Sequence, residues 1–337
     1  MTKAKPRFAV VGGLREDYFI TPSGEAHLRE IGGNVLYAGV GAAIWTSGVG
    51  LVARVGDNYP AEWIEQFKSR GFDTRGINVL KGWHDTRTFY AYLSLEERVD
   101  SDPAGHFARI GRPLPTELKD YTTSTEGQDD RRKFGPLAVR PADIPGSFHD
   151  IRGLHLAPCD YMTHRTLPEA MRALGVKVVT CDPSVRYMQP GLKAEVAAVV
   201  RGLDAFVPSE MEVRSYYRTD AMDPWEAAAE FAAMGCRIVV IKRGANGLFV
   251  YHAESGNKWL VPAYPVTVRD VTGAGDAFGG GFNVGLADTG DPVEAALRGA
   301  VSASIVIEGA GALTGLEAHP GLAQARLDSL RESIRKL

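Results

Sequence analysis

Short apolar runs alternate with segments of helical periodicity along most of the chain. The runs are rich in β-branched and aromatic residues, as expected of buried strands, and cover residues 8–11, 49–55, 176–181, 205–207 and 237–242. Segments with apolar residues at helical spacing separate them, at 35–46, 61–70, 165–174, 192–200 and 224–234. This alternation predicts an α/β fold with a doubly wound, mainly parallel sheet and helices on both faces. Ligands bind such sheets beyond the carboxyl ends of the strands.

Two segments, 16–30 and 84–100, depart from this alternation. Both contain strand-like pieces, at 18–20 and 88–93, without a crossover helix after them. We expect these pieces to form a small β-sheet that projects from the core and serves as a lid. The whole chain, 1–337, then forms a single domain, and the lid offers a surface through which two copies could form a homodimer.

Residues 100–145 form a polar stretch with little periodicity and a mixed run of charges at 129–133. Mixed charge runs are usually solvated, so we expect an exposed insertion, with a lid or a subunit contact as the alternatives. Beyond Gly315 the chain becomes polar, and the spacing of apolar residues predicts an amphipathic terminal helix over 322–337.

Composition narrows the function classes. The 337 residues are 45% hydrophobic and 23% charged, which suits a globular chain with a large core. The formal net charge of −3 provides no basic surface for nucleic acid or for an anionic membrane, and no apolar run reaches the roughly 18 residues of a membrane span. Small molecules are therefore the expected partners. The N-terminus lacks a signal-peptide pattern, so we expect a cytoplasmic protein.

The three cysteines, Cys159, Cys181 and Cys236, are widely spaced and include no C-x-x-C pair. An odd number of such residues supplies neither a disulfide framework nor a zinc cluster, so we expect buried thiols.

The most informative motif lies near the C-terminus, where Gly273, Ala274 and Gly275 directly precede Asp276 at an expected helix start. Small residues let backbone N–H groups converge, and a helix N-terminus adds free donors and a positive dipole end, so the turn can hold phosphate. A carboxylate repels phosphate. Asp276 therefore suggests a base that takes a proton from an alcohol attacking phosphorus, while a glycine turn with an N-capping Asp is the structural alternative.

Several other catalytic signatures are absent: the sequence contains no G-x-x-x-x-G-K-[ST], H-E-x-x-H or G-x-S-x-G. Residues 270–278, Asp-Val-Thr-Gly-Ala-Gly-Asp-Ala-Phe, resemble the C-terminal signature of the PfkB carbohydrate kinases, which have the ribokinase-like fold. The resemblance extends over nearly the whole chain. It implies an enzyme that uses ATP and Mg²⁺ to phosphorylate a hydroxyl of a sugar or sugar-like molecule, with Asp276 as general base and the backbone of residues 273–275 as the anion hole.

The same resemblance implies an acceptor site in the N-terminal half. Asp17 matches the acidic residue that holds sugar hydroxyls in relatives, and a carboxylate can accept two hydrogen bonds from a vicinal diol. Gly32, Gly33 and Asn34 are similar to the substrate motif of the family, although the following Val-Leu-Tyr departs from it. Arg186, in Asp-Pro-Ser-Val-Arg, could bind phosphate or carboxylate, or form a surface ion pair.

On the nucleotide side, the loop that begins with Lys242 and contains Gly244 and Gly247 resembles the ATP-binding loop of the family. The remaining implied roles are ATP binding by Thr272, orientation of the anion-hole loop or a monovalent-cation site for Asp270, and support of Mg²⁺ through water by Glu212. Ser209 stands where relatives usually carry Asn in the element that ends with Glu212.

Two alternatives stay open at this point. A nucleoside kinase would use the same chemistry, because the scaffold also accepts ribosides, and the departures at Tyr37 and Ser209 also allow a catalytically silent sugar- or nucleotide-binding protein. His155 lies at an expected strand end facing the cleft, where a hydrogen-bonded structural histidine is favoured over a substrate ligand.

Overall fold

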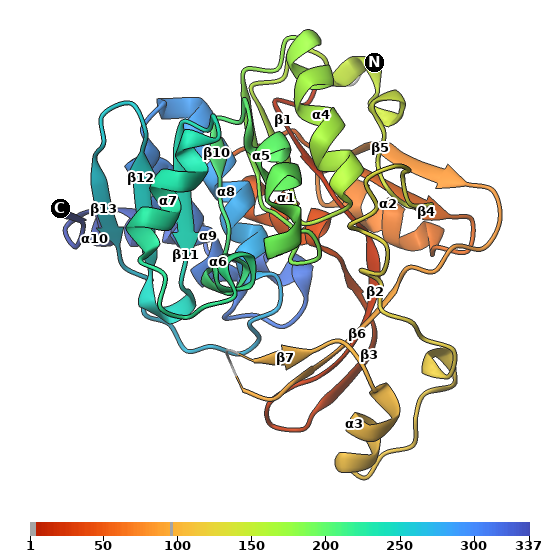
Figure 1. Ribbon diagram of the computed structural model, residues 1–337. Coiled ribbons are helices and arrows are strands. Elements are labelled where there is room, and N and C mark those ends of the chain that lie inside the picture. The colour runs from red at the N-terminus through yellow and green to blue at the C-terminus, as the bar shows by residue number, and fades with distance from the viewer. Residues whose placement is uncertain (1–4, 95–96) are drawn as a thin grey trace.

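A computed structural model of the chain describes residues 5–94 and 97–337 (Figure 1). Its main sheet has the order β14-β13-β12-β11-β10-β9-β8-β1-β4-β5, and the strands from β11 to β5 run parallel. The parallel strands, in chain order, are β1 (Phe8–Val11), β4 (Val49–Gly56), β5 (Asp73–Leu80), β8 (Gly153–Leu156), β9 (Val178–Cys181), β10 (Ala205–Phe206) and β11 (Ile238–Lys242). Three antiparallel strands complete one edge: β12 (Leu248–His252), β13 (Lys258–Val261) and β14 (Arg335–Lys336).

Helices cover both faces of this sheet, as the alternation of the sequence predicts. One apolar core joins alternate residues of β1, β4, β10, β11 and β12 to α1 (Asn34–Ala43), α2 (Ala61–Ser69), α8 (Ala274–Thr289), α9 (Pro292–Val306) and α10 (Leu322–Arg331). The opposite core packs β1, β8, β9 and β11 against α4 (Tyr161–Ala173), α5 (Lys193–Val200), α6 (Glu210–Tyr217) and α7 (Pro224–Ala233). The α/β fold with a doubly wound, mainly parallel sheet is therefore confirmed.

A separate four-stranded sheet projects from this core at the bottom of Figure 1. Its order is β3-β2-β6-β7, with β2 (Arg15–Ile20), β3 (Ala26–Gly32), β6 (Arg87–Tyr92) and β7 (Arg98–Val99). These strands lie in the two segments that were expected to form a lid, and we call them the lid sheet. Side chains alternate along each strand, so the lid sheet has two chemically different faces.

The segment 100–145 is largely exposed or half-buried, and a few buried side chains anchor it. It contains α3 (Pro103–Arg109), and buried Phe107 and Leu118 pack on the face of the lid sheet that carries Tyr18 and Phe89. Farther along, Val139 joins the main core. Sparse apolar residues at irregular spacing can still anchor a segment when the sheet beside them has an uncovered apolar face, which periodicity alone does not reveal. Short 3₁₀ turns lie here and in later loops: Thr116–Leu118, Pro141–Asp143, Gly146–Phe148, Pro190–Leu192, Gly244–Asn246 and Ala312–Glu317.

Two element boundaries also differ from the expected ones. The helix predicted at 165–174 begins a turn earlier, at Tyr161, because Tyr161 and His164 are buried against the core. The terminal helix predicted at 322–337 ends at Arg331, and β14 then pairs with the free edge of β13. The three cysteines are buried and free, as expected.

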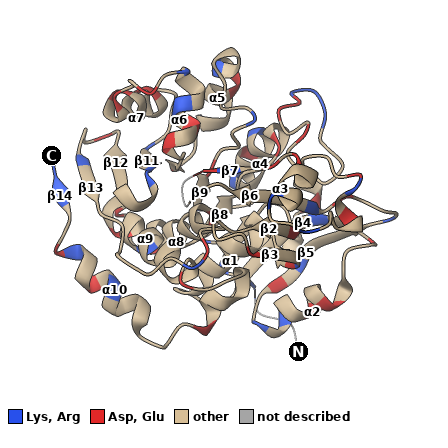
Figure 2. Cartoon of the chain, turned by 90° about the horizontal axis from the view of Figure 1, so that it is seen from below, with Lys and Arg blue, Asp and Glu red and all other residues tan. Residues whose placement is uncertain are grey.

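Charges of both signs are distributed over the loops and helices of the molecule (Figure 2). No helix in the described ranges is both long and apolar enough to cross a membrane.

Candidate active site

The turn before α8 places a glycine-rich backbone at a helix N-terminus. Gly273 precedes the helix with φ 75° and ψ 5°, a left-handed conformation that favours glycine. A Cβ at Gly273 would collide with the ring of Tyr37, which is 3% exposed and lies on α1. The ring of Tyr37 therefore packs directly against the turn. The Ala274 N–H donates to the Val271 carbonyl at 3.2 Å, while the next N–H groups of α8, those of Gly275 and Asp276, have no partner within the helix and can bind an anion.

Two hydrogen bonds fix the residues leading into this turn. The Asp270 carboxylate accepts from the Thr272 N–H at 2.9 Å, and the Thr272 hydroxyl lies 2.6 Å from the hydroxyl of Tyr92 on the lid sheet. Asp270, Thr272 and Tyr92 are all buried. Asp270 thus holds the backbone of the turn, while Thr272 connects it to the lid sheet.

Asp276 lies in the first turn of α8, close to the cation of Lys242 at the end of β11. A Cβ at Gly275 would lie 3.4 Å from the Lys242 Nζ, so the ammonium group is beside the turn. Burial raises the pKa of Asp276, against the positive charges of Lys242 and Arg98. A raised pKa makes a carboxylate a stronger base, which suits proton abstraction.

Lys242 forms an ion pair with buried Asp182, in the loop after β9. Burial alone would lower the pKa of Lys242, but the negative charges of Asp182 and Glu212 raise it, so the lysine stays charged. One oxygen of Asp182, Oδ1, is buried without a hydrogen-bond partner among the described residues. The sequence pointed to the loop containing Asp182, but not to this pairing with a residue 60 positions away.

Glu212 and Ser209 form a capping box at the start of α6. The Ser209 Oγ accepts from the Glu212 N–H at 3.3 Å, while Glu212 Oε2 accepts from the Ser209 N–H at 2.7 Å and from its hydroxyl at 2.8 Å. Ser209 therefore fulfils the local N-cap role well although relatives usually carry Asn there. Burial raises the pKa of Glu212, opposed by Lys242.

The predicted nucleotide loop follows β11 as a 3₁₀ turn. Gly244 and Gly247 have φ of 53° and 79°, and a Cβ at Gly247 would collide with the Val261 carbonyl oxygen. The position of Gly247 therefore needs glycine, and the loop begins directly after Lys242. This arrangement brings the loop to the same edge of the sheet as Asp276.

Asp17 is the most unusual residue of the predicted acceptor site. It is 1% exposed, and both of its carboxylate oxygens lack hydrogen-bond partners among the described residues. Burial raises its pKa to about 7, against the opposing effect of the Tyr90 hydroxyl, Arg15 and the Gly33 N–H, which lie near the carboxylate but outside hydrogen-bonding geometry. A Cβ at Gly32 would collide with this carboxylate, so the glycine makes room for it. A buried carboxylate with free lone pairs is costly unless a ligand supplies donors.

Asn34 holds the acceptor region together through both ends of its amide. Its oxygen accepts from the Gly13 N–H at 2.8 Å, and its nitrogen donates to the Pro158 carbonyl. The amide therefore joins the turn after β1 to the loop after β8, at the start of α1. Gly33, with φ 102°, passes so close to Gly13 that a Cβ would collide with the Gly13 carbonyl oxygen.

Arg186 and His155 have structural surroundings. The Arg186 Nε donates to Thr125 Oγ1 at 2.7 Å, which attaches the loop after β9 to the segment 100–145. The His155 Nδ1 lies 2.9 Å from Thr180 Oγ1, and its Nε2 faces Gly279 on α8, where a Cβ would collide with it. Burial lowers the pKa of His155 to about 3, so the ring is neutral near pH 7.

Three lid residues near the site were not singled out in the sequence. Phe19, Tyr90 and Tyr92 pack together against Val271, just before the Gly273 turn. The Arg98 guanidinium lies 5.1 Å from the Tyr90 ring centroid, and its positive charge opposes the burial that raises the pKa of Tyr92. Period-two alternation in β6 could have placed Tyr90 and Tyr92 on one face, but no local signal indicated that this face meets Val271.

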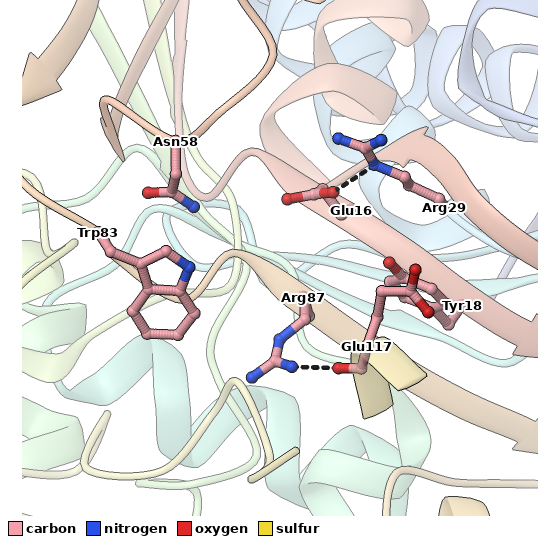
Figure 3. A pocket seen from close by; sticks show the side chains of 7 residues that line it. All are labelled: Glu16, Tyr18, Arg29, Asn58, Trp83, Arg87 and Glu117. Carbon is pink, nitrogen blue, oxygen red and sulfur yellow. Dashed lines mark hydrogen bonds and ion pairs between the residues drawn. The ribbon is translucent and has the colours of Figure 1, made fainter. Parts of the chain in front are cut away.

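The opposite face of the lid sheet borders a cavity of about 330 Å³ (Figure 3). Its charged side chains already have partners: Arg29 pairs with Glu16 at 3.0 Å, and Arg87 pairs with Asp85 and donates to the Glu117 carbonyl. The cavity is thus separated by the lid sheet from Asp17 on the other face.

Close packing of α1 against α8 joins the two halves of the site. A Cβ at Gly41 would collide with the Ala277 carbonyl oxygen, and one at Gly280 with the Ala38 carbonyl oxygen. The two helices therefore touch backbone to backbone. Their N-termini carry Gly33 with Asn34 and the Gly273 turn, respectively. Consistent with this, Asp17, Asp270 and Asp276 all raise the pKa of the buried Tyr37, after the larger effect of burial.

Within residues 5–94 and 97–337, no three His, Cys, Asp or Glu side chains converge closely enough to bind one metal ion directly. Mg²⁺ keeps several water ligands and is often held by one or two carboxylates and by substrate phosphates. The unpartnered Asp182 oxygen and the carboxylate of Glu212 fit that kind of site.

Comparison with known proteins agrees with this geometry. The model of the pfkB family carbohydrate kinases matches residues 146–319. A cytidine kinase from Thermococcus kodakarensis is 26% identical over 86% of this chain and 91% of its own length. A 2-dehydro-3-deoxygluconokinase from Thermoproteus tenax is 30% identical over 77% of this chain and 73% of its own. A structure described as ribokinase II from E. coli, in complex with ATP and Mg²⁺, has a TM-score of 0.69 at 18% identity and covers 96% of this chain and 99% of its own.

Proposed function

The chain belongs to the pfkB family of carbohydrate kinases, and we propose that it transfers the γ-phosphoryl group of ATP to a hydroxyl of a sugar or sugar-like acceptor, with Asp276 as general base. The observation that carries this proposal is the convergence of three features at one edge of the main sheet. They are the left-handed Gly273 turn, the Asp276 carboxylate behind it and the Lys242 ammonium group beside it.

Asp17 is proposed to hold the acceptor. Its two unpartnered oxygens can each accept a hydrogen bond from neighbouring hydroxyl groups, which offsets the cost of burying the carboxylate. Gly32 and Gly33 leave space at this position, and Asn34 keeps the surrounding loops in place. Arg186 is assigned to the attachment of the segment 100–145 rather than to direct substrate binding, because Thr125 occupies its Nε.

In the proposed reaction, the acceptor hydroxyl passes its proton to Asp276 as its oxygen bonds to the γ-phosphorus, and the bond from that phosphorus to the bridging oxygen of ADP breaks. Backbone N–H groups of residues 273–275 stabilise the negative charge on the transferred group. Lys242 and the Gly244–Gly247 loop hold the ATP phosphates, and Asp270 orients the turn through the Thr272 N–H. Mg²⁺ would neutralise phosphate charge, supported by Glu212 and Asp182.

A nucleoside is the second candidate acceptor. The aromatic side chains of Phe19, Tyr90 and Tyr92 lie on the same lid face as Asp17 and could pack against a base. The similarity to a protein named cytidine kinase also favours this candidate.

The test is a screen with Mg-ATP in which sugars, sugar acids, polyols and nucleosides are offered and phosphorylated products are detected by mass. Asp276→Asn should lower kcat by roughly 10² or more, the usual contribution of a general base, while ATP binding and the melting temperature are retained. Asp328→Asn, which changes an exposed carboxylate on α10, is the matched control and should leave kcat unchanged.

An Asp276→Asn enzyme with the turnover of the unmodified protein would rule out the general-base assignment. Saturable binding of acceptors without any phosphorylated product would favour a silent binding protein instead.

A further inference from the structure

The contact between Tyr92 and Thr272 joins the lid sheet to the turn proposed to bind the transferred phosphoryl group. Tyr92 ends β6, and Thr272 immediately precedes Gly273. Their hydroxyl oxygens are 2.6 Å apart across a sequence separation of 180 residues, and the two side chains are 5% and 4% exposed. Such a short bond between buried hydroxyls fixes both side chains relative to each other.

The positive charge of Arg98 favours one direction for this hydrogen bond. The Arg98 guanidinium lies over the Tyr90 ring, 5.1 Å from its centroid, and its charge acts against the burial that raises the pKa of Tyr92. A more acidic hydroxyl is the better donor, so the Tyr92 O–H donates to Thr272 Oγ1. The hydroxyl proton of Thr272 is then not needed for the contact with Tyr92 and can be donated towards the adjoining anion site.

The surroundings strengthen this chain of hydrogen bonds. Tyr92 packs with Phe19, Tyr90 and Val271, which keep water from the contact. Hydrogen bonds are stronger in such a low dielectric, and each member of a chain polarises the next. Arg98 supplies a positive charge at the far end, also stacked over the Tyr90 ring. The whole arrangement depends on the lid sheet lying against residues 271–272.

We infer that Arg98, Tyr92 and Thr272 form a relay in which Tyr92 acts as a positioning residue: it aligns the Thr272 hydroxyl with the anion site only while the lid sheet covers the acceptor site. This inference rests on the proposed phosphoryl transfer at Asp276 and adds a coupling between lid position and the anion hole. When the lid sheet moves away, Thr272 loses its partner. The Thr272 hydroxyl is then not aligned with the anion site until an acceptor is enclosed, which disfavours transfer of the phosphoryl group to water.

The experiment is a double-mutant cycle of Tyr92→Phe and Thr272→Val, with steady-state kinetics for ATP and acceptor. Tyr92→Phe keeps the aromatic packing but removes the hydroxyl, and kcat should fall roughly three- to tenfold, the usual effect of one hydrogen bond. The KM for ATP should stay the same, because the relay orients Thr272 without holding the nucleotide in place. After Thr272→Val, adding Tyr92→Phe should cause no further loss.

Tyr121→Phe is the matched control on the other face of the lid sheet. The Tyr121 hydroxyl accepts from the Phe89 N–H at 3.1 Å, so this change also removes one lid hydrogen bond, but kcat should be unaffected. Independent losses of kcat in the two single variants that multiply in the double variant would overturn the relay.

Amide hydrogen exchange of the ligand-free protein separates this inference from the proposed reaction. Tyr92→Phe should speed exchange at residues 270–273, and Tyr121→Phe should not. If the unmodified protein phosphorylates no acceptor, the proposed function fails, and exchange still decides whether Tyr92 positions the turn. Unchanged exchange at residues 270–273 in Tyr92→Phe would overturn the relay.

Discussion

The two faces of the lid sheet have different surroundings. One face carries Asp17, Tyr90 and Tyr92, where the Asp17 oxygens have no hydrogen-bond partner among the described residues and Tyr92 contacts Thr272 just before the Gly273 turn. The other presents Tyr18 and Phe89, which are covered by the chain's own segment 100–145. Along each strand, residues that face the proposed site therefore alternate with residues that face the packed segment 100–145.

This difference bears on how the lid sheet is stabilised. A small sheet is marginally stable alone, and its apolar face needs a cover. Phe107 and Leu118 supply that cover from within the chain. The other face, which carries Phe19, Tyr90 and Tyr92, is then free to carry Asp17 as well, a group that reduces stability until a ligand binds.

The largest effect is expected for Asp17→Asn, on the face of the lid sheet that also carries Tyr90 and Tyr92. The amide keeps the shape but removes the charge and one acceptor, so two charge-assisted hydrogen bonds to the acceptor are weakened. We expect kcat/KM for the acceptor to fall by about 10³, equivalent to about 4 kcal/mol. Steady-state kinetics with the acceptor from the Mg-ATP screen measure this. An unchanged kcat/KM would mean that Asp17 does not hold the acceptor.

The pH dependence of stability isolates the same carboxylate without substrate. The pKa of Asp17 is raised from 3.8 to about 7, so the folded state binds a proton that the unfolded state has lost. Stability of the unmodified protein relative to Asp17→Asn should therefore fall as pH rises from about 4 to about 7, by at most about 4 kcal/mol, and level off above. Urea unfolding of both proteins across this range measures the difference. A constant difference would show that Asp17 is ionised throughout.

A smaller effect, on stability rather than on turnover, is expected on the face of the lid sheet that carries Tyr18 and Phe89. Phe107→Ala removes a buried ring from the cover of the lid sheet and should cost about 3 kcal/mol of unfolding free energy. At a temperature where the variant is folded, its kcat should stay close to that of the unmodified protein, because Phe107 packs on the face of the lid sheet opposite Asp17 and Tyr92. Denaturant unfolding and turnover assays are compared. A loss of turnover without a loss of stability would contradict the division between the two faces.

Local patterns predicted much of this molecule. The strands at 8–11, 49–55 and 237–242 and the helix at 35–46 were expected from their apolar composition, and nearly all of their residues are buried. The 270–278 motif also predicted a helix beginning just before Asp276, since a glycine turn followed by an acidic residue is typical of a helix N-terminus. The roles of these site residues are still proposals.

Contacts between distant segments could not be predicted in this way. Tyr92 meets Thr272, and Asp182 meets Lys242, only after the lid sheet has been placed over the carboxyl edge of the main sheet. The irregular spacing of Phe107 and Leu118 carried no periodic signal, although both are buried. In each case the partner surface determines the position, and no local pattern in the sequence specifies that surface.

The glycine contact between α1 and α8 would fix a distance in the proposed reaction. Gly41 and Gly280 let the helix backbones touch, so no side chain separates α1, which begins with Asn34, from α8, which begins with the Gly273 turn. The distance from the proposed acceptor to the attacked phosphorus would then be set by main-chain geometry. Under this proposal, changes on the lid sheet would alter acceptor preference without altering the distance over which the phosphoryl group moves.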